Sequence, residues 1–366
     1  MNDQPPRSGF ASSLLGNSFV HPLFDYLLIG GGLSLLVAGL VYWTAPMAAG
    51  GGGQGYSIHA RFAWIPMVIL LSNSTHFASS TVRLYSKPGT FQALPFLTMA
   101  FPLVCLLVTT LCMVYPVNLG TNLQKLYLIW SPYHYAAQAY GLAVMYSYRS
   151  GCQLSLNDKR LMRWISMLPF FLVCLGGEGF GLYALLPEAW MAQPTVHSAV
   201  MVLKQWLFPL LIFGLPVALF IKIWVTEQKP LPLISLLVLL VNGCWWVVFT
   251  DYLQAFTLAT IFHGVQYLAI VLIFHVRDQK QRPTNRHGTL YHVLWFYGAS
   301  LLLGYGLFHC LPWAYRLAGF GVVESMLLVA AAINIHHFIV DAYIWKLGKK
   351  DSNRTIVDSD QAPVFV

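Results

Sequence analysis

Charged residues are scarce in this chain, and their scarcity excludes a soluble globular protein. Asp, Glu, Lys and Arg make up only 9% of the 366 residues, hydrophobic residues make up 57%, and the mean hydropathy is +0.62. A soluble domain carries about 25% charged residues, because water must wet its surface. Most of the outer surface of this protein must therefore face hydrocarbon.

Cysteine pairs and a signal peptide are also missing. No two of the six cysteines are spaced as Cys-x-x-Cys, so the sequence offers neither a zinc knuckle nor a disulfide framework. Four of them fall inside apolar runs, where cysteine behaves as a small buried hydrophobe. Residues 1–20 are polar and mixed, and the first apolar run begins too late and is too long for a cleavable signal.

The basic residues form no continuous stripe, although the formal net charge is +8. Lys and Arg occur singly or in small groups between apolar runs, which is typical of cytoplasmic loops in membrane proteins. We therefore expect no nucleic-acid partner.

Ten apolar segments approach the roughly 20 residues that a membrane-spanning helix needs. They cover about 24–45, 62–85, 92–115, 125–148, 163–186, 200–224, 231–251, 253–276, 290–311 and 317–345. The sequence therefore predicts an all-α, polytopic membrane helix bundle with about ten transmembrane helices. Its expected organisation is a cytoplasmic N-terminal segment at 1–23, a transmembrane helical domain at 24–346 and a disordered cytoplasmic tail at 347–366.

The distribution of charge predicts the orientation of this bundle. If the N-terminus lies inside, 17 of the 21 Lys and Arg residues fall on inside segments. The four on the outside are Arg61, Lys125, Lys204 and Arg316. Cytoplasmic loops are enriched in Lys and Arg, so the sequence predicts an N-in, C-in protein of the cell membrane, as in a bacterial-type inner membrane.

Five of the twelve histidines lie well inside predicted spans. They are His76, His134, His263, His336 and His337. Ionisable residues at membrane depth are costly and usually functional. In the predicted topology all four helices that carry them run from outside to inside, and the helical rise places them within about a dozen ångströms of depth. They could form one compact cluster or two neighbouring sites.

Polar residues accompany these histidines on the same helix faces. They are Asn73, Gln138, Gln266, Tyr267, Asn334 and Asp341. Residues three or four apart share a face of a helix, so we expect these side chains to orient the histidines or to contact a cofactor. Asp341, four residues after His337, could also bind a metal directly.

Metal binding explains this pattern economically. Neutral imidazole is the commonest protein ligand for transition metals, and a histidine-rich site without thiolates favours an iron or copper ion, or a haem held by one or two histidines. The alternative is that the histidines only bridge helices through hydrogen bonds. The His-x-x-x-His and His-x-x-His-His boxes of membrane desaturases are missing from the chain.

The sequence leaves three functions open. The first is an oxidoreductase or oxygenase that takes a lipid-soluble substrate, such as a quinone, a lipid or an isoprenoid, sideways from the lipid bilayer. The second is a proton-coupled or metal transporter or channel, in which the same residues line a pathway. The third is an accessory subunit of a membrane complex; a homo-oligomer is compatible with any of them.

Overall fold

The computed structural model describes residues 14–48, 65–176, 188–249 and 252–345, together with Asn353, Ile356 and Val357. Within these ranges all regular structure is helical and no strand occurs. Residues 1–13 of the predicted N-terminal segment and most of the predicted tail lie outside the described residues.

The described helices occur in the following order along the chain. The first half of the chain contains α2 (Pro22–Phe24), η1 (Asp25–Ile29), α3 (Gly32–Ala48), α5 (Ile65–Ile69), η2 (Leu70–Ser74), α6 (Thr75–Ser86), α7 (Thr90–Ala93), η3 (Phe96–Ala100), α8 (Phe101–Val114), η4 (Pro116–Gly120), α9 (Thr121–Arg149) and α10 (Leu156–Cys174). The second half contains α12 (Glu188–Met191), α13 (Pro194–Val202), η5 (Leu203–Leu207), α14 (Phe208–Glu227), α15 (Leu233–Val248), α16 (Tyr252–Lys280), α17 (Thr289–Tyr305), η6 (Gly306–Cys310), α18 (Leu311–Leu317) and α19 (Val322–Ile344). The elements labelled η are π-helical turns.

Five helical runs of the described residues are long and apolar enough to cross a membrane. They are Phe96–Val114, Pro194–Glu227, Tyr252–Lys280, Thr289–Leu317 and Val322–Ile344. A sixth is added if Pro22–Ile29 and Gly32–Leu40, which meet at 57°, form one span. Each of the ten predicted ranges overlaps a helix. However, fewer than ten of these helices are long and apolar enough to count as candidate membrane spans. Helix α15 has only 16 residues, and α6, α9 and α10 carry many polar side chains.

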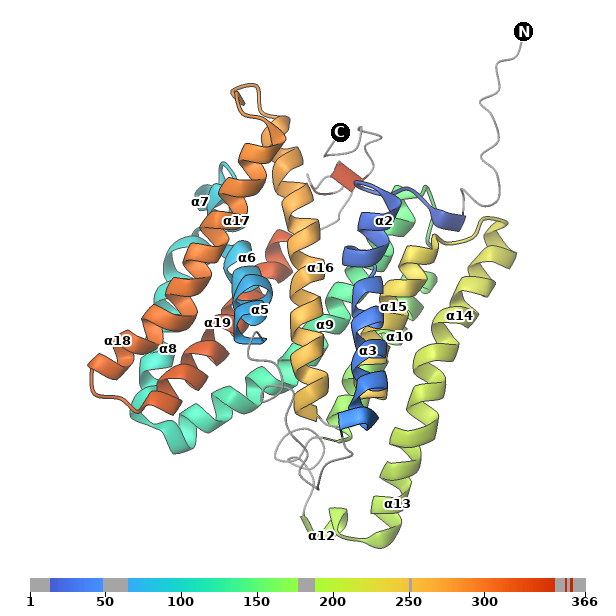
Figure 1. Cartoon of the computed structure of the whole chain (residues 1–366), viewed down its shortest axis with the longest axis horizontal. Helices are drawn as coiled ribbons and strands as arrows, with labels where there is room; N and C mark the ends of the chain where they lie inside the picture. Colours follow the sequence, from blue (N-terminus) through green and yellow to red (C-terminus); the bar gives the residue numbers. More distant parts are fainter. Residues whose placement is uncertain are drawn as a thin grey trace.

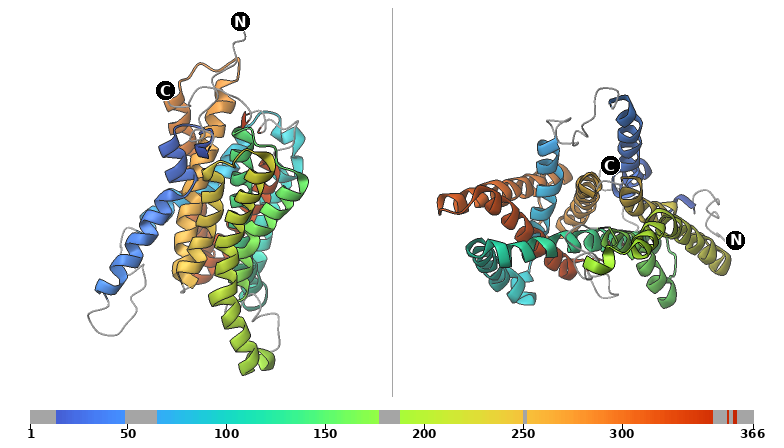
Figure 2. Two further views of the ribbon diagram at one scale, coloured as in Figure 1. Left: turned by 90° about the vertical axis from the view of Figure 1, so that its right-hand side faces the viewer. Right: turned by 90° about the horizontal axis from the view of Figure 1, so that it is seen from below.

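Helix α16 runs through the middle of the bundle (Figure 1). Helices α5, α6, α17 and α19 lie on one side of it and α3, α10, α14 and α15 on the other, and the view from below in Figure 2 shows the same division. Helix α16 packs directly on α6, α15 and α17. In the apolar stretch of α16, 83% of the residues are buried. Helix α16 is therefore the core helix that connects the two halves.

Loops rich in basic residues meet at one end of the bundle. The Nζ atom of Lys229, after α14, donates to the backbone oxygen of Ser150, after α9, at 2.8 Å. The Nη2 atom of Arg282, after α16, donates to the backbone oxygen of Ser86, at the end of α6, at 3.1 Å. The α14–α15 and α16–α17 connections lie at the top of Figure 1.

Two described residues of the predicted tail lie at this same end. The Nη2 atom of Arg83 donates to Oδ1 of Asn353 at 3.0 Å, and the Nη1 atom of Arg277 donates to the backbone oxygen of Ile356 at 3.1 Å. Asn353 and Ile356 are both buried. This part of the tail therefore covers the ends of α6 and α16.

Candidate metal centre

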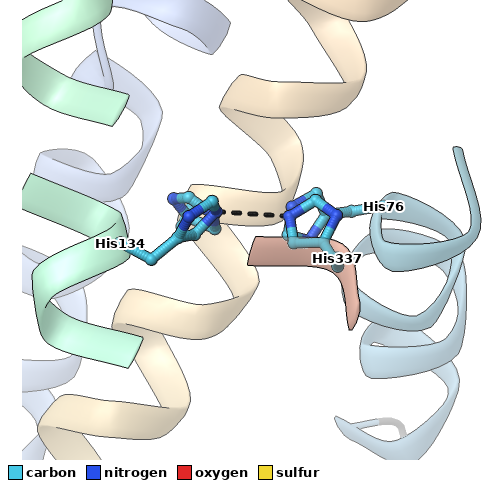
Figure 3. Close-up of side chains that lie close together, drawn as sticks. His76, His134 and His337 are labelled. Atoms are coloured by element: carbon cyan, nitrogen blue, oxygen red, sulfur yellow. Dashed lines mark hydrogen bonds between the residues drawn. The ribbon is translucent and has the colours of Figure 1, made fainter. Parts of the chain in front are cut away.

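Four helices each contribute one histidine to a single buried group. His76 comes from α6, His134 from α9, His263 from α16 and His337 from α19. If one ring nitrogen is taken from each histidine, these four nitrogens all lie within 4.8 Å of one another. The four residues are only 0–8% exposed. Figure 3 shows His76, His134 and His337 with their rings turned toward one another. We refer to these four residues as the His cluster.

Close helix contacts hold the His76 helix in place. A Cβ atom on Gly264, in α16, would lie 3.1 Å from the backbone oxygen of Ser72 in η2. A Cβ atom on Gly304, in α17, would lie 2.7 Å from the backbone oxygen of Ser74. Small residues let helix backbones approach closely within a membrane bundle. These two glycines therefore allow the start of α6 to sit against both neighbours, with His76 directly following.

The hydrogen bonds of His337 identify which of its nitrogens is available to a ligand. The hydroxyl of Ser80 donates its proton to the backbone oxygen of Phe77 at 3.0 Å. The Ser80 oxygen, with its own proton used in this way, lies 2.9 Å from Nδ1 of His337 and can accept the proton of an Nδ1–H tautomer. In a neutral imidazole the other nitrogen then bears a lone pair. Nε2 of His337 therefore presents a lone pair to the centre of the cluster.

Acceptor atoms converge on this nitrogen. Nε2 of His337 lies 3.2 Å from Nε2 of His134, the contact drawn as a dashed line in Figure 3, and 3.2 Å from Oδ2 of Asp341. Oδ2 of Asp341 also lies 3.8 Å from Nε2 of His134. Electron pairs brought this close repel one another unless a cation or a proton lies between them.

The two remaining histidines have ring nitrogens without a partner among the described residues. Both nitrogens of His76 and Nε2 of His263 are buried and make no hydrogen bond. Each buried polar atom left unsatisfied costs about 1–3 kcal/mol. An ion at the centre of the cluster would satisfy one nitrogen of each ring and separate the facing lone pairs of His134 and His337.

The spacing of the cluster suits a metal ion. Metal–imidazole bonds of about 2.0–2.1 Å place two tetrahedral ligand nitrogens about 3.4 Å apart. The separation of 3.2 Å between the His134 and His337 nitrogens is close to this value. The widest separation, 4.8 Å, requires only a small inward shift of the side chains.

A chain of hydrogen bonds fixes the carboxylate beside the cluster. The Tyr267 hydroxyl donates to Oδ1 of Asp341 at 2.6 Å, and Nε1 of Trp345 donates to the Tyr267 oxygen at 3.0 Å. This arrangement leaves Oδ2 of Asp341 turned toward the histidines. Ser80 and Trp345 were not predicted from the sequence, although each follows a predicted residue, His76 or Asp341, by four positions on the same helix face.

Gln138, Gln266 and Asn334, which were predicted to orient the histidines, donate hydrogen bonds to backbone oxygens, not to the histidine rings. Nε2 of Gln138 donates to the backbone oxygen of His263 at 3.4 Å, and Nδ2 of Asn334 donates to Ala330 within its own helix at 2.7 Å. Nε2 of Gln266 donates to the backbone oxygen of Ile29 at 3.0 Å. The oxygens of Asn73, Gln138 and Asn334 have no partner among the described residues. Gln266 was expected to orient His263; instead it binds the bend between η1 and α3.

His336 was expected as a metal ligand, but the structure does not bring it into the cluster. Its ring stacks on Phe101 of α8, with ring centroids 5.0 Å apart and an interplanar angle of 12°. Adjacent residues on an α-helix point about 100° apart, so His336 and His337 cannot both face the same interior point. Tyr135, by contrast, lies close to the cluster, with its ring centroid 4.4 Å from that of His263.

A cavity of about 600 Å³ reaches the cluster from one side. His134 and Asp341 line it, and so does Lys159. The Lys159 Nζ atom lies 5.1 Å from the ring centroid of Tyr148, which is about 21 Å along α9 from His134. Other lining residues are Trp130, Tyr133, Gly141, Phe338 and Trp345. The cavity therefore extends from the metal centre toward the end of the bundle that carries the basic loops.

Replacing Asp341 by asparagine (Asp341→Asn) is expected to lower the metal affinity about 10–100-fold, because outer carboxylates tune metal sites by this amount. The amide keeps the shape but removes the negative charge beside His134 and His337. Competition with a chelator of known affinity measures the change. Glu324→Gln, at an exposed position near the start of the same helix, should leave the affinity unchanged. Equal loss in both variants would contradict the assigned role of Asp341.

Comparison of the chain with protein-family models, with curated proteins and with solved structures gives no match. A function must therefore be inferred from the geometry of the site. A buried group of four histidines, with one carboxylate beside it, lies inside a helical protein that has apolar, membrane-length helices. This group could hold a metal ion.

Proposed function

We propose that this protein is an integral membrane oxidoreductase that holds one redox-active metal ion in the His cluster and acts on a lipid-soluble, linear substrate. The observation that carries the proposal is the convergence of ring nitrogens of His134 and His337 and a carboxylate oxygen of Asp341 at one end of a mainly apolar cavity, which His134 and Asp341 line. When bound, the ion would supply redox chemistry at that end. The surrounding residues hold the substrate against it.

The donor set favours iron or copper as the ion. Four imidazoles and a carboxylate are ligands typical of these metals, and no cysteine among the described residues belongs to the cluster. A single ion fits better than a haem. The macrocycle of a haem occupies the plane between its two axial ligands, whereas here four nitrogens converge from four helices within 4.8 Å.

The shape of the cavity supports a linear substrate. Its lining on α9 extends from Trp130 to Tyr148, a helical rise of about 27 Å. A volume of about 600 Å³ spread over that length makes the cavity elongated. Such an elongated, mainly apolar channel suits an extended hydrocarbon or isoprenoid chain. Lys159 at the far end would contact a polar or anionic head group.

Surface-exposed residues on both walls support access from the bilayer. Tyr133 on α9 is 36% exposed, and Ala342 on α19 is also exposed. Both residues line the cavity. A substrate dissolved in the membrane could therefore enter between α9 and α19 without crossing the polar surface.

We also propose that the bundle crosses the cell membrane about ten times, with both ends in the cytoplasm. The contacts among the basic loops at one end of the bundle support this orientation, because Lys and Arg accumulate on the cytoplasmic side. The shorter and more polar helices would then be shielded from lipid by the five or six apolar ones.

Elemental analysis of the purified protein tests the metal assignment. We expect about one iron or copper ion per chain, retained during gel filtration in the presence of a weak chelator. Protein that contains neither metal after expression in supplemented medium would contradict the proposal. Rapid loss to the chelator, together with metal uptake into proteoliposomes, would instead indicate a transporter. Copurification with a larger assembly on which metal retention depends would indicate an accessory subunit.

Filling the cavity should separate substrate binding from metal binding. Gly141 lines the cavity, and a Cβ atom on it would meet no atom within 4 Å. Gly141→Leu is expected to weaken binding of a fluorescent linear polyene fatty acid at least about tenfold, because the added side chain occupies the channel. The metal content should stay at the wild-type level. Tryptophan-sensitised emission of the probe measures the binding.

Gly214→Leu provides the control for this experiment. Gly214 lies on the exposed face of α14, a Cβ atom there also meets nothing within 4 Å, and the residue does not line the cavity. Gly214→Leu should bind the polyene like the wild type. Unchanged binding in Gly141→Leu would show that the linear substrate does not occupy this cavity.

A further inference from the structure

A second, larger cavity lies at the end of the bundle that carries the basic loops, between α6, the end of α16 and α17. Its volume is about 780 Å³, within the range of small-molecule sites. The residues that line it include His275, Gln279 and Arg282 from α16 and the loop after it, and Val82 and Tyr85 from α6. None of the residues of the His cluster lines this cavity.

His275 is the most deeply buried histidine of this cavity. It lies on α16, twelve residues after His263, but it was not among the predicted site residues. The residue is only 2% exposed, and its ring is held between Trp295, with centroids 5.8 Å apart, and Phe296, with centroids 4.4 Å apart. Its Nε2 atom has no hydrogen-bond partner among the described residues. A buried nitrogen left without a partner in a residue of the cavity wall is available to a ligand atom or a water molecule.

The rim of the cavity is basic. Arg282 and Arg286 both line it, together with His287 and His292, and none of its described lining residues is acidic. Arg282 is tied to the backbone oxygen of Ser86, whereas Arg286 is exposed at the rim. Nε2 of His292 is paired with Oδ1 of Asn285 at 2.9 Å. Arginine forks of this kind suit phosphate oxygens.

The other wall of the cavity is apolar and elongated. Tyr291, Trp295, Ala299 and Leu303 line it at intervals of four residues and therefore share one face of α17. This stripe extends about 18 Å along the helix, starting beside the arginines. Tyr291 and Trp295 are about half exposed, at 48% and 46%. The cavity thus has a cationic end and an apolar groove that starts from it.

These features do not form a second metal site. The ring centroids of His275 and His292 are 6.3 Å apart, and those of His287 and His292 are 6.2 Å apart. Among the described residues, the group of histidines close enough to hold an ion is the His cluster. A ligand of this cavity would therefore be recognised by its cationic rim and by imidazole nitrogens, not through a bound ion.

We propose that this cavity binds an anionic amphiphile, with a phosphate head group at Arg282, Arg286 and the His275 nitrogen, and with one hydrocarbon chain along the α17 stripe. Basic pockets between helices on the cytoplasmic side are the sites where anionic lipid head groups bind. The proposal depends on the proposed membrane orientation but not on the metal. The head group would bridge α16 and α17, the helix that packs on the His76 helix.

Native mass spectrometry of the purified full chain in detergent tests this proposal. The probes are dioctanoyl phosphatidylglycerol, dioctanoyl phosphatidylcholine and inorganic phosphate. We expect the wild type to bind phosphatidylglycerol more tightly than the other two. Arg286→Gln should weaken that binding about fivefold, because one basic residue near an anionic lipid contributes about that factor. Arg160→Gln, at an exposed position outside the cavity, should bind like the wild type.

A pair of substitutions at His275 tests the buried contact. His275→Phe keeps the ring in place beside Trp295 but removes the nitrogen, so binding of phosphatidylglycerol should weaken. His275→Gln restores a hydrogen-bonding group and should recover part of it. A melting temperature in detergent near the wild-type value in all variants shows that the protein is folded, whether or not it holds a metal.

Three results would overturn the proposal. The first is equal weakening in Arg286→Gln and Arg160→Gln, which would indicate a general charge effect. The second is inorganic phosphate that binds as tightly as the lipid, which would assign the cavity to a free anion. The third is unchanged lipid binding in His275→Phe, which would place the head group outside the cavity.

Discussion

Replacing His337 by alanine (His337→Ala) is expected to reduce the bound metal from about one ion per chain to a small fraction. The substitution removes the lone pair that faces both His134 and Asp341. Loss of a direct ligand should exceed the 10–100-fold effect of losing an outer contact. Elemental analysis after gel filtration in weak chelator measures the remaining metal, and the visible spectrum of an iron or copper form should disappear with it.

The neighbouring histidine provides a closely matched control. His336→Ala changes the same residue type, on the same helix, one position away, but its ring stacks on Phe101 outside the cluster. We expect His336→Ala to keep the metal at the wild-type level. Equal loss in the two variants would mean that metal retention depends on α19 as a whole, and it would remove the support for the His cluster.

Gly304→Ala is expected to destabilise the protein by about 1–3 kcal/mol, a typical cost of overpacking a tight contact. The added Cβ atom would lie 2.7 Å from the backbone oxygen of Ser74 and 2.9 Å from its carbonyl carbon. Backbone atoms cannot rotate away, so α17 must move from the start of α6. The melting temperature in detergent should fall by a few degrees, and the metal affinity should decrease because His76 follows that contact directly.

Gly298→Ala, almost two turns earlier in the same helix, is the matched control. A Cβ atom at Gly298 meets nothing within 4 Å. Alanine favours a helix over glycine by up to about 1 kcal/mol, so this variant should be as stable as the wild type or slightly more stable. If Gly304→Ala were equally stable, the close contact between α17 and η2 would not be needed for the fold.

The fold class could be predicted because it follows from composition and hydropathy, which can be read directly from the sequence. A content of 9% charged residues leaves no alternative to an apolar outer surface, and every predicted span overlaps a helix in the structure. The number of membrane-spanning helices could not be predicted as reliably as the fold class. Helix α9 carries Pro132 and many polar side chains in its 29 residues, because one of its faces contributes His134 to the cluster and lines the cavity. Such a helix satisfies a length criterion but not a hydropathy criterion.

The candidate site could be predicted in part for a related reason. Burying an imidazole in an apolar helix is costly, so the four histidines of the cluster stood out from their surroundings. The direction in which each histidine points from its helix could not be predicted in this way. His336 and His337 are equally conspicuous in the sequence, and only the packing of α19 on α8 and α9 distinguishes them. The bond from Gln266 to Ile29 likewise depends on a bend in α2–α3 that local spacing does not encode.

The order in which the histidines occur along the chain has a consequence for biosynthesis. His76 is the first of the four to be translated, whereas His337 belongs to α19, the last of the long helices described. Three of the imidazoles are therefore made before the fourth. An ion that needs all four could be captured at full affinity only once α19 has been translated and packed. If the cluster holds a metal as proposed, a nascent chain that stops before α19 would be left without it.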